Sequence, residues 1–179
     1  MQVNELLNDD NEIMQAMQKH KDSVESFDAE SVHVETKNTQ MSTLIQRIEN
    51  NEINFAPEFQ RSNEVWDDVR QSRLIESMML RNPLPVFYMD ASNDGKWKIV
   101  DGLQRLNTIK RFVVKDELEL TGLQIMRDRN GQRFSELGRE LQRRITEADI
   151  VIHQIRKETP EPAIYEIFNR INTGGTPLS

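Results

Sequence analysis

The sequence predicts an α/β (α+β) domain, because segments with helical and strand periodicity alternate along the chain from Thr39 onward. Apolar residues recur at helical spacing within residues 41–48 and again within residues 103–113. Residues 85–89 and 96–100 have the short apolar and alternating patterns of strands, and an Asp-Gly turn lies between them. A chain of 179 residues is long enough for one such domain with its own core.

The remaining elements follow from the same periodicity and from their stop signals. In chain order, the pattern predicts a helix over 41–48, a brief strand over 53–55, an ordered loop over 57–61, a helix from Asp67 that ends before Asn82 and Pro83, strands over 85–89 and 96–100, a helix over 103–113, short strands and a turn over 118–131, a helix from Ser135 to about Ala148, a strand over 149–156, and a helix over 160–171.

Charge divides the chain unevenly and suggests its organisation. Residues 1–60 hold 4 Lys and Arg against 12 Asp and Glu, a balance of −8, whereas residues 61–179 hold 19 against 18. We therefore expect an acidic N-terminal lead-in over residues 1–38, before a domain over residues 39–179. A basic excess between Arg105 and Arg144 leaves room for a local anion site, although the net charge of −7 argues against non-specific duplex binding.

Composition excludes several classes of protein. The chain has no cysteine, which rules out a disulfide scaffold, a thiolate zinc site and a cysteine nucleophile. His20, His33 and His153 show no ligand spacing, so a structural histidine is the expected role of His153. No run of 18 apolar residues, no secretory pattern at the N-terminus and no Walker-type loop is present. We expect a cytoplasmic protein that does not interact with membranes and is not a P-loop NTPase.

The main candidate site residues lie in the segment Asp101-Gly102-Leu103-Gln104-Arg105, where a predicted strand meets a predicted helix. The N–H groups at a helix start attract anions, a glycine lets a phosphate approach the backbone, and an arginine fork matches phosphate oxygens. Asp101 is placed to serve a magnesium ion or orient a water, and Gln104 to contact a ribose, base or water. The alternative is a plain helix N-terminus with Asp101 as its cap and Arg105 as a solvated charge.

A second segment, Phe59-Gln60-Arg61, offers another arginine just after a short strand and before Trp66. Arg61 is a second candidate phosphate ligand, and Gln60 accompanies it. The alternative places Arg61 on the surface, over the ring of Trp66.

Taken together, four segments resemble the N-terminal domain of GmrSD-type modification-dependent restriction systems, in both order and spacing. They are Pro57-Glu58-Phe59-Gln60-Arg61 with Val65-Trp66, Leu74-Ile75-Glu76-Ser77 with Asn82-Pro83-Leu84-Pro85, Val100 to Leu106, and Phe168 to Ser179. The resemblance covers about residues 39–179, and several separated motifs in order are more specific than any one alone. The wider superfamily includes the ParB N-terminal domain and sulfiredoxin, although sulfiredoxin chemistry needs a cysteine that this chain lacks.

This resemblance implies a small ParB/sulfiredoxin-like fold, a mixed sheet with flanking helices, that binds a nucleoside triphosphate at the Gly-x-x-Arg turn. The GmrSD-like branch usually carries Asp-Gly-Gln-Gln-Arg and is associated with NTP hydrolysis that controls an HNH-type nuclease. Here Leu103 replaces the first Gln. Either this replacement reduces turnover while binding survives, or the Leu103 side chain faces the core and the position is structural.

The resemblance also carries over the segment from Asn169 to Gly175 as a further wall of the site, with Arg170 and Asn172 as nucleotide ligands. The alternative is a helix C-terminus with Gly174 in the left-handed cap position. Nothing at Ser179 resembles a natural end, so we expect a C-terminal effector domain beyond it.

The resemblance therefore implies an NTP-binding and NTP-hydrolysing regulatory domain with three groups of site residues. Asp101, Gln104 and Arg105 are the expected catalytic residues, Asp101 the magnesium ligand, and Gln60, Arg61, Gly102, Arg105, Arg170 and Asn172 the nucleotide-binding residues. GTP, ATP and CTP are not distinguished, and a homodimer is one option for the oligomeric state. Expected partners are a nuclease domain and, through the full-length protein, DNA.

Two other functions stay open at this point. One is a non-enzymatic ParB-like module that binds or senses DNA, supported by the basic excess between Arg105 and Arg144. The other is a nucleotide-free interaction domain that only positions a nuclease, which the replacement at Leu103 keeps open.

Overall fold

The computed structural model describes residues 14–15, 28–56 and 65–174, with side chains described as far as Ile171. The chain forms two compact units. The larger unit runs from Val34 to Arg156 and contains the whole sheet. The smaller unit combines the residues up to His33 with those from Lys157 onward.

A five-stranded mixed sheet forms the framework of the larger unit, in the order β1-β5-β3-β4-β2. The strands are β1 (Val34–Gln40), β2 (Ile53–Asn54), β3 (Phe87–Asp90), β4 (Trp97–Asp101) and β5 (Asp149–Ile155). Strands β1 and β5 pair antiparallel, as do β3 and β4, whereas β3 with β5 and β2 with β4 are parallel pairs. This sheet and its helices confirm the predicted α/β (α+β) class.

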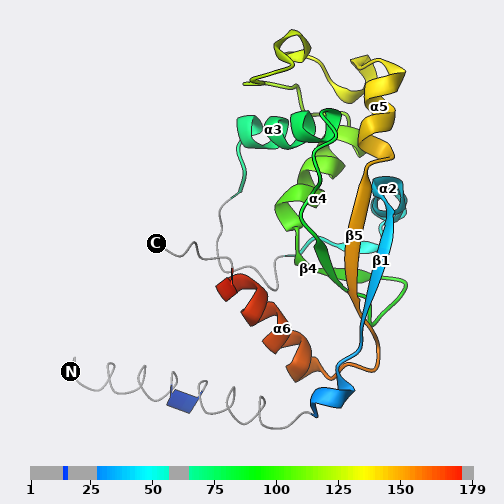
Figure 1. Cartoon of the computed structure of the whole chain (residues 1–179), viewed down its shortest axis with the longest axis vertical. Coiled ribbons are helices and arrows are strands. Elements are labelled where there is room, and N and C mark those ends of the chain that lie inside the picture. Colours follow the sequence, from blue (N-terminus) through cyan, green and yellow to red (C-terminus); the bar gives the residue numbers. More distant parts are fainter. Residues whose placement is uncertain (1–13, 16–27, 57–64, 175–179) are drawn as a thin grey trace, which may run out of the picture. The chain divides into compact units, whose positions relative to one another are not determined.

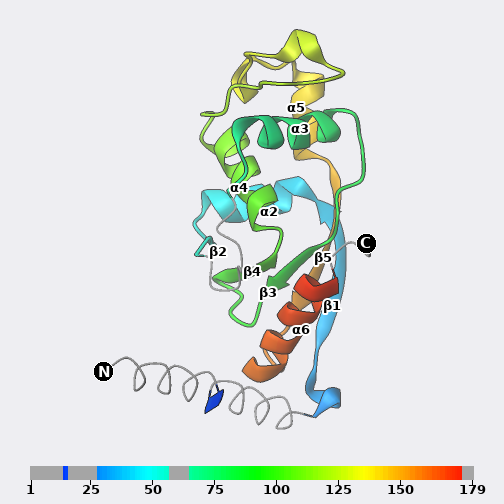
Figure 2. The same cartoon turned by 90° about the vertical axis from the view of Figure 1, so that its left-hand side faces the viewer.

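The described residues of the same unit form four helices: α2 (Met41–Glu49), α3 (Asp68–Met79), α4 (Leu103–Ile109), which continues as a π-helical stretch over Lys110–Val114, and α5 (Arg139–Thr146). Figures 1 and 2 both place α3 and α5 on the far side of α2 and α4 from strands β3 and β4. Helix α3 packs on α4 and α5, and α2 packs on α5 and on the π-helical stretch.

One apolar core joins the sheet to these helices, as the helical spacing predicted. Helices α2 and α4 bury residues that the sequence placed on single apolar faces, such as Leu44 and Leu106. Among the described residues, the largest fully buried side chains are those of Phe87, Phe112, Met41, Leu44, Ile75, Met78, Met79, Met89, Leu106, Ile109, Leu118 and Leu120. This packing anchors the first turn of α4 in the core.

Helix α3 has both of its ends closed by local hydrogen bonds. At its start the Asp67 carboxylate accepts from the N–H of Arg70 at 2.8 Å, as the acidic start predicted. At its end Asn82 donates its N–H to the Ser77 carbonyl at 2.9 Å, and Arg81 donates to Met78 at 3.0 Å. This pair of bonds is a Schellman motif, and Arg81 takes the left-handed position with a φ of 61°.

Two parts of the larger unit differ from the sequence-based expectation. Strand β1 was not predicted, because its residues are polar and mostly exposed and only the ladder to β5 makes them a strand. The prediction of short strands over 118–131 is wrong, since this segment is an irregular loop with one 3-10 turn, Arg127–Arg129. Helix α5 also starts later than predicted, at Arg139, after a separate 3-10 turn over Phe134–Glu136.

The smaller unit contains the 3-10 turn Ala29–Ser31 and helix α6 (Glu161–Gly174). The Thr159 hydroxyl joins its two segments, since it accepts from the N–H of His33 at 2.9 Å and donates to the His33 carbonyl at 3.1 Å. Helix α6 runs through Gly174, so the expected left-handed cap at Gly174 is wrong. A glycine adopts helical and left-handed backbone with similar ease, and the sequence alone did not separate the two.

Candidate functional site

The turn between β4 and α4 has the strand-to-helix form that the sequence predicted. Strand β4 ends at Asp101, Gly102 is the N-cap with a φ of 111°, and α4 starts at Leu103. No described side chain forms a capping hydrogen bond at this helix start. The N–H groups of the first turn therefore have no side-chain acceptor in the part of the chain that the structure describes, and such groups attract anions.

Gly102 is required by the packing of the protein itself. A Cβ at this position would lie 2.6 Å from Cδ1 of Phe87 and 3.3 Å from Nη2 of Arg105. Phe87 is fully buried, so its ring cannot move aside without disturbing the core. The positive φ angle adds a second reason for glycine here.

Arg105 lies under this turn and is 8% exposed. Its guanidinium donates to the carbonyl of Pro85 and, at 3.1 Å, to the carbonyl of Val86. It also lies 4.2 Å from the centre of the Phe87 ring and 3.5 Å from Asp101 Oδ2. Burial lowers the pKa of Arg105, and the Asp101 carboxylate opposes that shift. The Arg105 guanidinium therefore links the start of α4 to Pro85 and Val86, the two residues that precede β3.

Asp101 reaches the outer side of the sheet because of an irregularity in β4. Met89 pairs with Ile99 and Tyr88 with Asp101, so Val100 is an extra residue between the two pairs. Without this bulge, strict alternation would place Asp101 on the same side as the buried Ile99. The Asp101 side chain is instead 41% exposed. The bulge therefore turns this carboxylate away from the core.

Gln104 joins the turn to the segment before α3. Its Oε1 accepts a hydrogen bond from the N–H of Trp66 at 3.1 Å. The ring of Trp66 is in turn covered by the guanidinium of Arg70, 4.7 Å from the ring centre. Gln60 and Arg61 lie outside the described residues, but they precede Trp66 by only a few positions.

Leu103 is 7% exposed and belongs to the hydrophobic core. Of the two alternatives for this position, the structure confirms that the side chain faces the core. The replacement of Gln by Leu therefore changes a packing residue and leaves the outer side of the turn as it is.

Arg170 and Asn172 lie on α6, in the smaller unit. Arg170 donates through Nε to Glu166 Oε1 at 2.9 Å, one helical turn away. Asp101, Gly102, Gln104 and Arg105 are thus brought together in the larger unit, and Arg170 and Asn172 belong to a different one.

Comparison with known proteins identifies the family. Residues 41–179 match the family described as "GmrSD restriction endonuclease, N-terminal domain". The chain belongs to this family. No curated protein and no solved structure matches it.

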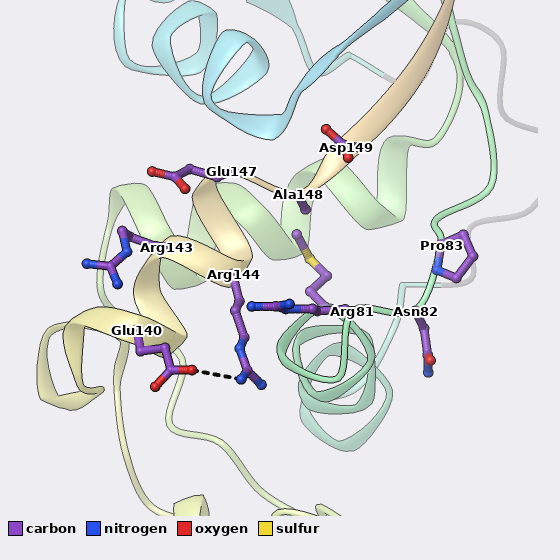
Figure 3. A pocket seen from close by; sticks show the side chains of 10 residues that line it. Arg81, Asn82, Pro83, Glu140, Arg143, Arg144, Glu147, Ala148 and Asp149 are labelled. Carbon is purple, nitrogen blue, oxygen red and sulfur yellow. Dashed lines mark hydrogen bonds and ion pairs between the residues drawn. The ribbon is translucent and has the colours of Figure 1, made fainter.

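This GmrSD N-terminal domain also contains a pocket of about 470 Å³ that is separate from the β4–α4 turn. Figure 3 shows Arg81 extending from the end of α3 toward α5, where Arg144 lies. Arg144 donates to the Met79 carbonyl at 2.9 Å and to Glu140 at 2.8 Å. Three arginines and three acidic residues line the pocket, namely Arg81, Arg143, Arg144, Glu140, Glu147 and Asp149. No predicted site residue is among them.

The domain's described residues contain no group of three His, Cys, Asp or Glu side chains able to hold a metal ion by themselves. None of the helices among these residues has the length and apolar character needed to cross a membrane. Asp101 is a lone carboxylate, and Mg²⁺ in nucleotide sites is commonly held by one or two carboxylates together with the phosphates of the ligand.

Proposed function

We propose that this domain binds a nucleoside triphosphate at the β4–α4 turn and hydrolyses it, as the regulatory part of a GmrSD-type restriction system. Family membership makes the chain a component of a restriction system. The observation that supports nucleotide binding is the turn itself. An uncapped helix start, a glycine with a φ of 111° and an outward carboxylate at Asp101 lie within three consecutive residues.

Each residue of the turn has a distinct role in this proposal. The N–H groups at the start of α4 bind phosphate oxygens, and Asp101 holds Mg²⁺ together with those phosphates. Gln104 positions the ligand and accepts a hydrogen bond from the N–H of Trp66. Arg105 holds the geometry of the turn through the carbonyls of Pro85 and Val86 and through its ion pair with Asp101. Gln60, Arg61, Arg170 and Asn172 are further proposed ligands.

Hydrolysis in this proposal depends on positioning and charge, as in phosphoryl transfer generally. The buried side chain of Leu103 supports it, because the family's usual Gln at this position would also point into the core. The candidate nucleotides are ATP, GTP and CTP. Through the full-length protein, hydrolysis would control a nuclease that acts on DNA.

The basic segment between Arg105 and Arg144 does not favour a DNA-binding module as a second function. Five of its eight arginines form ion pairs with carboxylates of the same unit: Arg105 with Asp101, Arg111 with Asp68, Arg129 with Asp128, Arg133 with Glu119 and Arg144 with Glu140. Paired arginines contribute little net positive field, and phosphate neutralisation is the main source of duplex affinity.

Titration calorimetry of the chain with ATP, GTP and CTP in the presence of magnesium tests the proposal. Asp101→Asn should lose at least about tenfold of the magnesium-dependent affinity, since it removes a charge that holds the metal. Asp128→Asn is the matched control, because Asp128 is also an exposed carboxylate 3.5 Å from an arginine. The absence of heat with all three nucleotides, together with no change in Arg105→Ala, would falsify nucleotide binding.

A further inference from the structure

A row of four side chains crosses the sheet and ends at the β4–α4 turn. Thr36 on β1 is paired with His153 on β5, His153 with Tyr88 on β3, and Tyr88 with Asp101 on β4. Residues paired in a ladder point to the same face of a sheet, so all four side chains lie on one face. Figure 2 shows the strands β1, β5, β3 and β4 that carry this row.

The bulge at Val100 is what completes the row. Tyr88 and His153 alternate with the buried residues Phe87, Met89 and Ile152, so they point away from the core. Asp101 joins them only because the extra residue shifts the phase of β4 by one position. A local irregularity thus brings the carboxylate of the turn into line with an aromatic pair.

The contacts within this row leave the Tyr88 hydroxyl and Nε2 of His153 available for hydrogen bonds to a ligand. The rings of Tyr88 and His153 lie 4.9 Å apart at an angle of 50°, and both residues are half-buried. Nδ1 of His153 is within 2.8 Å of the Thr36 hydroxyl, which fixes the orientation of the imidazole. Among the described residues, Tyr88 Oη and His153 Nε2 have no hydrogen-bond partner.

We infer that Tyr88 and His153 bind the nucleoside part of the nucleotide whose phosphates occupy the β4–α4 turn. This inference rests on the function proposed above. Adjacent strands are about 5 Å apart, so Tyr88 lies one spacing and His153 two spacings from Asp101 along the row. A nucleoside triphosphate anchored by its phosphates at the turn is long enough to lay its ribose and base over these rings.

The chemistry of the two rings fits a nucleoside. An aromatic face stacks with any base, so Tyr88 supplies affinity with little base preference. The Tyr88 hydroxyl and Nε2 of His153 offer hydrogen bonds to ribose hydroxyls or to a base edge. Thr36 acts through His153, as a positioning residue that holds the imidazole plane.

The test compares a magnesium nucleotide with magnesium tripolyphosphate, which has the phosphates without the nucleoside. ATP, GTP and CTP are titrated separately into the whole chain by calorimetry, and the tightest binder is used for the variants. Tyr88→Leu should weaken nucleotide binding by about ten- to a hundredfold, the range expected for one stacked base, and leave tripolyphosphate binding unchanged. Tyr88→Phe should retain most of the nucleotide affinity, because it keeps the ring.

His153→Ala should also weaken nucleotide binding without affecting tripolyphosphate, and His33→Ala is its matched control. His33 is exposed and contributes only its backbone to the bond with Thr159. Unchanged tripolyphosphate binding by Tyr88→Leu also shows that the variant is folded.

The outcomes separate this inference from the proposed function. Two results would overturn only this inference and place the nucleoside elsewhere. In the first, Tyr88→Leu binds the nucleotide as tightly as the wild type does. In the second, Tyr88→Leu loses affinity for the nucleotide and for tripolyphosphate to the same extent, whereas Tyr88→Phe keeps both affinities. If the wild-type chain binds none of the three nucleotides, the proposed function is overturned, and the inference with it.

Discussion

The β4–α4 turn and the loop over residues 122–131 are built from the same two parts, a buried charge and a glycine with a positive φ. In the turn these are Arg105 and Gly102, with a φ of 111°. In the loop they are Glu76, which reaches over from α3, and Gly122, with a φ of 66°. Each glycine lies against an apolar side chain that a Cβ would meet within 3 Å.

The two regions differ in how many of their polar groups already have partners within the protein. The Glu76 carboxylate accepts hydrogen bonds from the N–H groups of Gln124, Ile125 and Met126, at 3.0 to 3.2 Å, so its bonding capacity is used within the protein. In the turn, Arg105 is satisfied by two backbone carbonyls and pairs with Asp101, but the Asp101 side chain stays 41% exposed and no described side chain caps the start of α4. A region closed on itself is structural, whereas one that keeps open donors and a charge is suited to a ligand.

Gly102→Ala should have the largest effect of the changes considered, about 4 kcal/mol of unfolding free energy, from left-handed backbone strain plus displacement of Phe87. Gly131→Ala is the matched control, since its φ is 85° but a Cβ would meet nothing within 4 Å. The control should lose only about 1 kcal/mol in urea unfolding. Equal losses in the two variants would show that Phe87 yields to the added methyl group.

Much of the β4–α4 turn could be predicted from the sequence because its parts are local. The end of a strand, a glycine and the apolar spacing of a helix are contiguous, and the structure has all three. The partners of Arg105 could not be predicted in this way, since Pro85 and Val86 lie about twenty positions earlier. The interpretation of Arg105 as a solvated charge is wrong, because the side chain is buried.

The bulge at Val100 shows a second limit of sequence patterns. The alternation of Trp97, Lys98 and Ile99 is correct, but continuing it by one period places Asp101 on the core side. Only the pairing with β3 reveals the extra residue. Glu76 was missed for a similar reason, since its three N–H donors are 48 to 50 positions away and no local pattern marks them.

Glu76→Ala should be the next most damaging change, at about 3 kcal/mol, because it leaves three partly buried N–H groups without an acceptor. The change should lower stability and leave nucleotide affinity unchanged, since the loop takes no part in the proposed nucleotide site. Amide hydrogen exchange should increase first at Gln124, Ile125 and Met126, where the hydrogen bonds are lost. Loss of nucleotide affinity from the folded variant would contradict the division of the molecule into a closed region and an open one.

The same carboxylate predicts a pH dependence of stability. Burial raises the pKa of Glu76, but hydrogen bonds from the N–H groups of Met126, Ile125 and Gln124, with the charge of Arg73, lower it to below its ordinary value. A carboxyl whose pKa is depressed in the folded state stabilises the protein above its unfolded pKa, and this contribution is lost as the pH falls through the folded pKa.

Glu76→Gln should therefore lose about 1.5 kcal/mol at neutral pH, because the charged acceptor is replaced by a neutral one. The difference from the wild type should shrink as the pH falls below about 4.3, the value of an unfolded glutamate, and vanish below the folded pKa. Urea unfolding at a series of pH values measures it. A difference that stays constant down to strongly acidic pH would mean that the Glu76 charge does not stabilise the loop.

Leu103→Gln should have the smallest effect on stability, about 1 kcal/mol for burying an amide at a site that is 7% exposed. Because this side chain points to the core, restoring the family's Gln should not raise the rate of nucleotide hydrolysis, measured as phosphate release. Leu103→Met, a volume-conserving change, is the control and should keep both stability and rate close to those of the wild type. A clear gain in hydrolysis by Leu103→Gln alone would mean that the side chain at position 103 reaches the bound nucleotide. Position 103 would then be a ligand position and not a packing position.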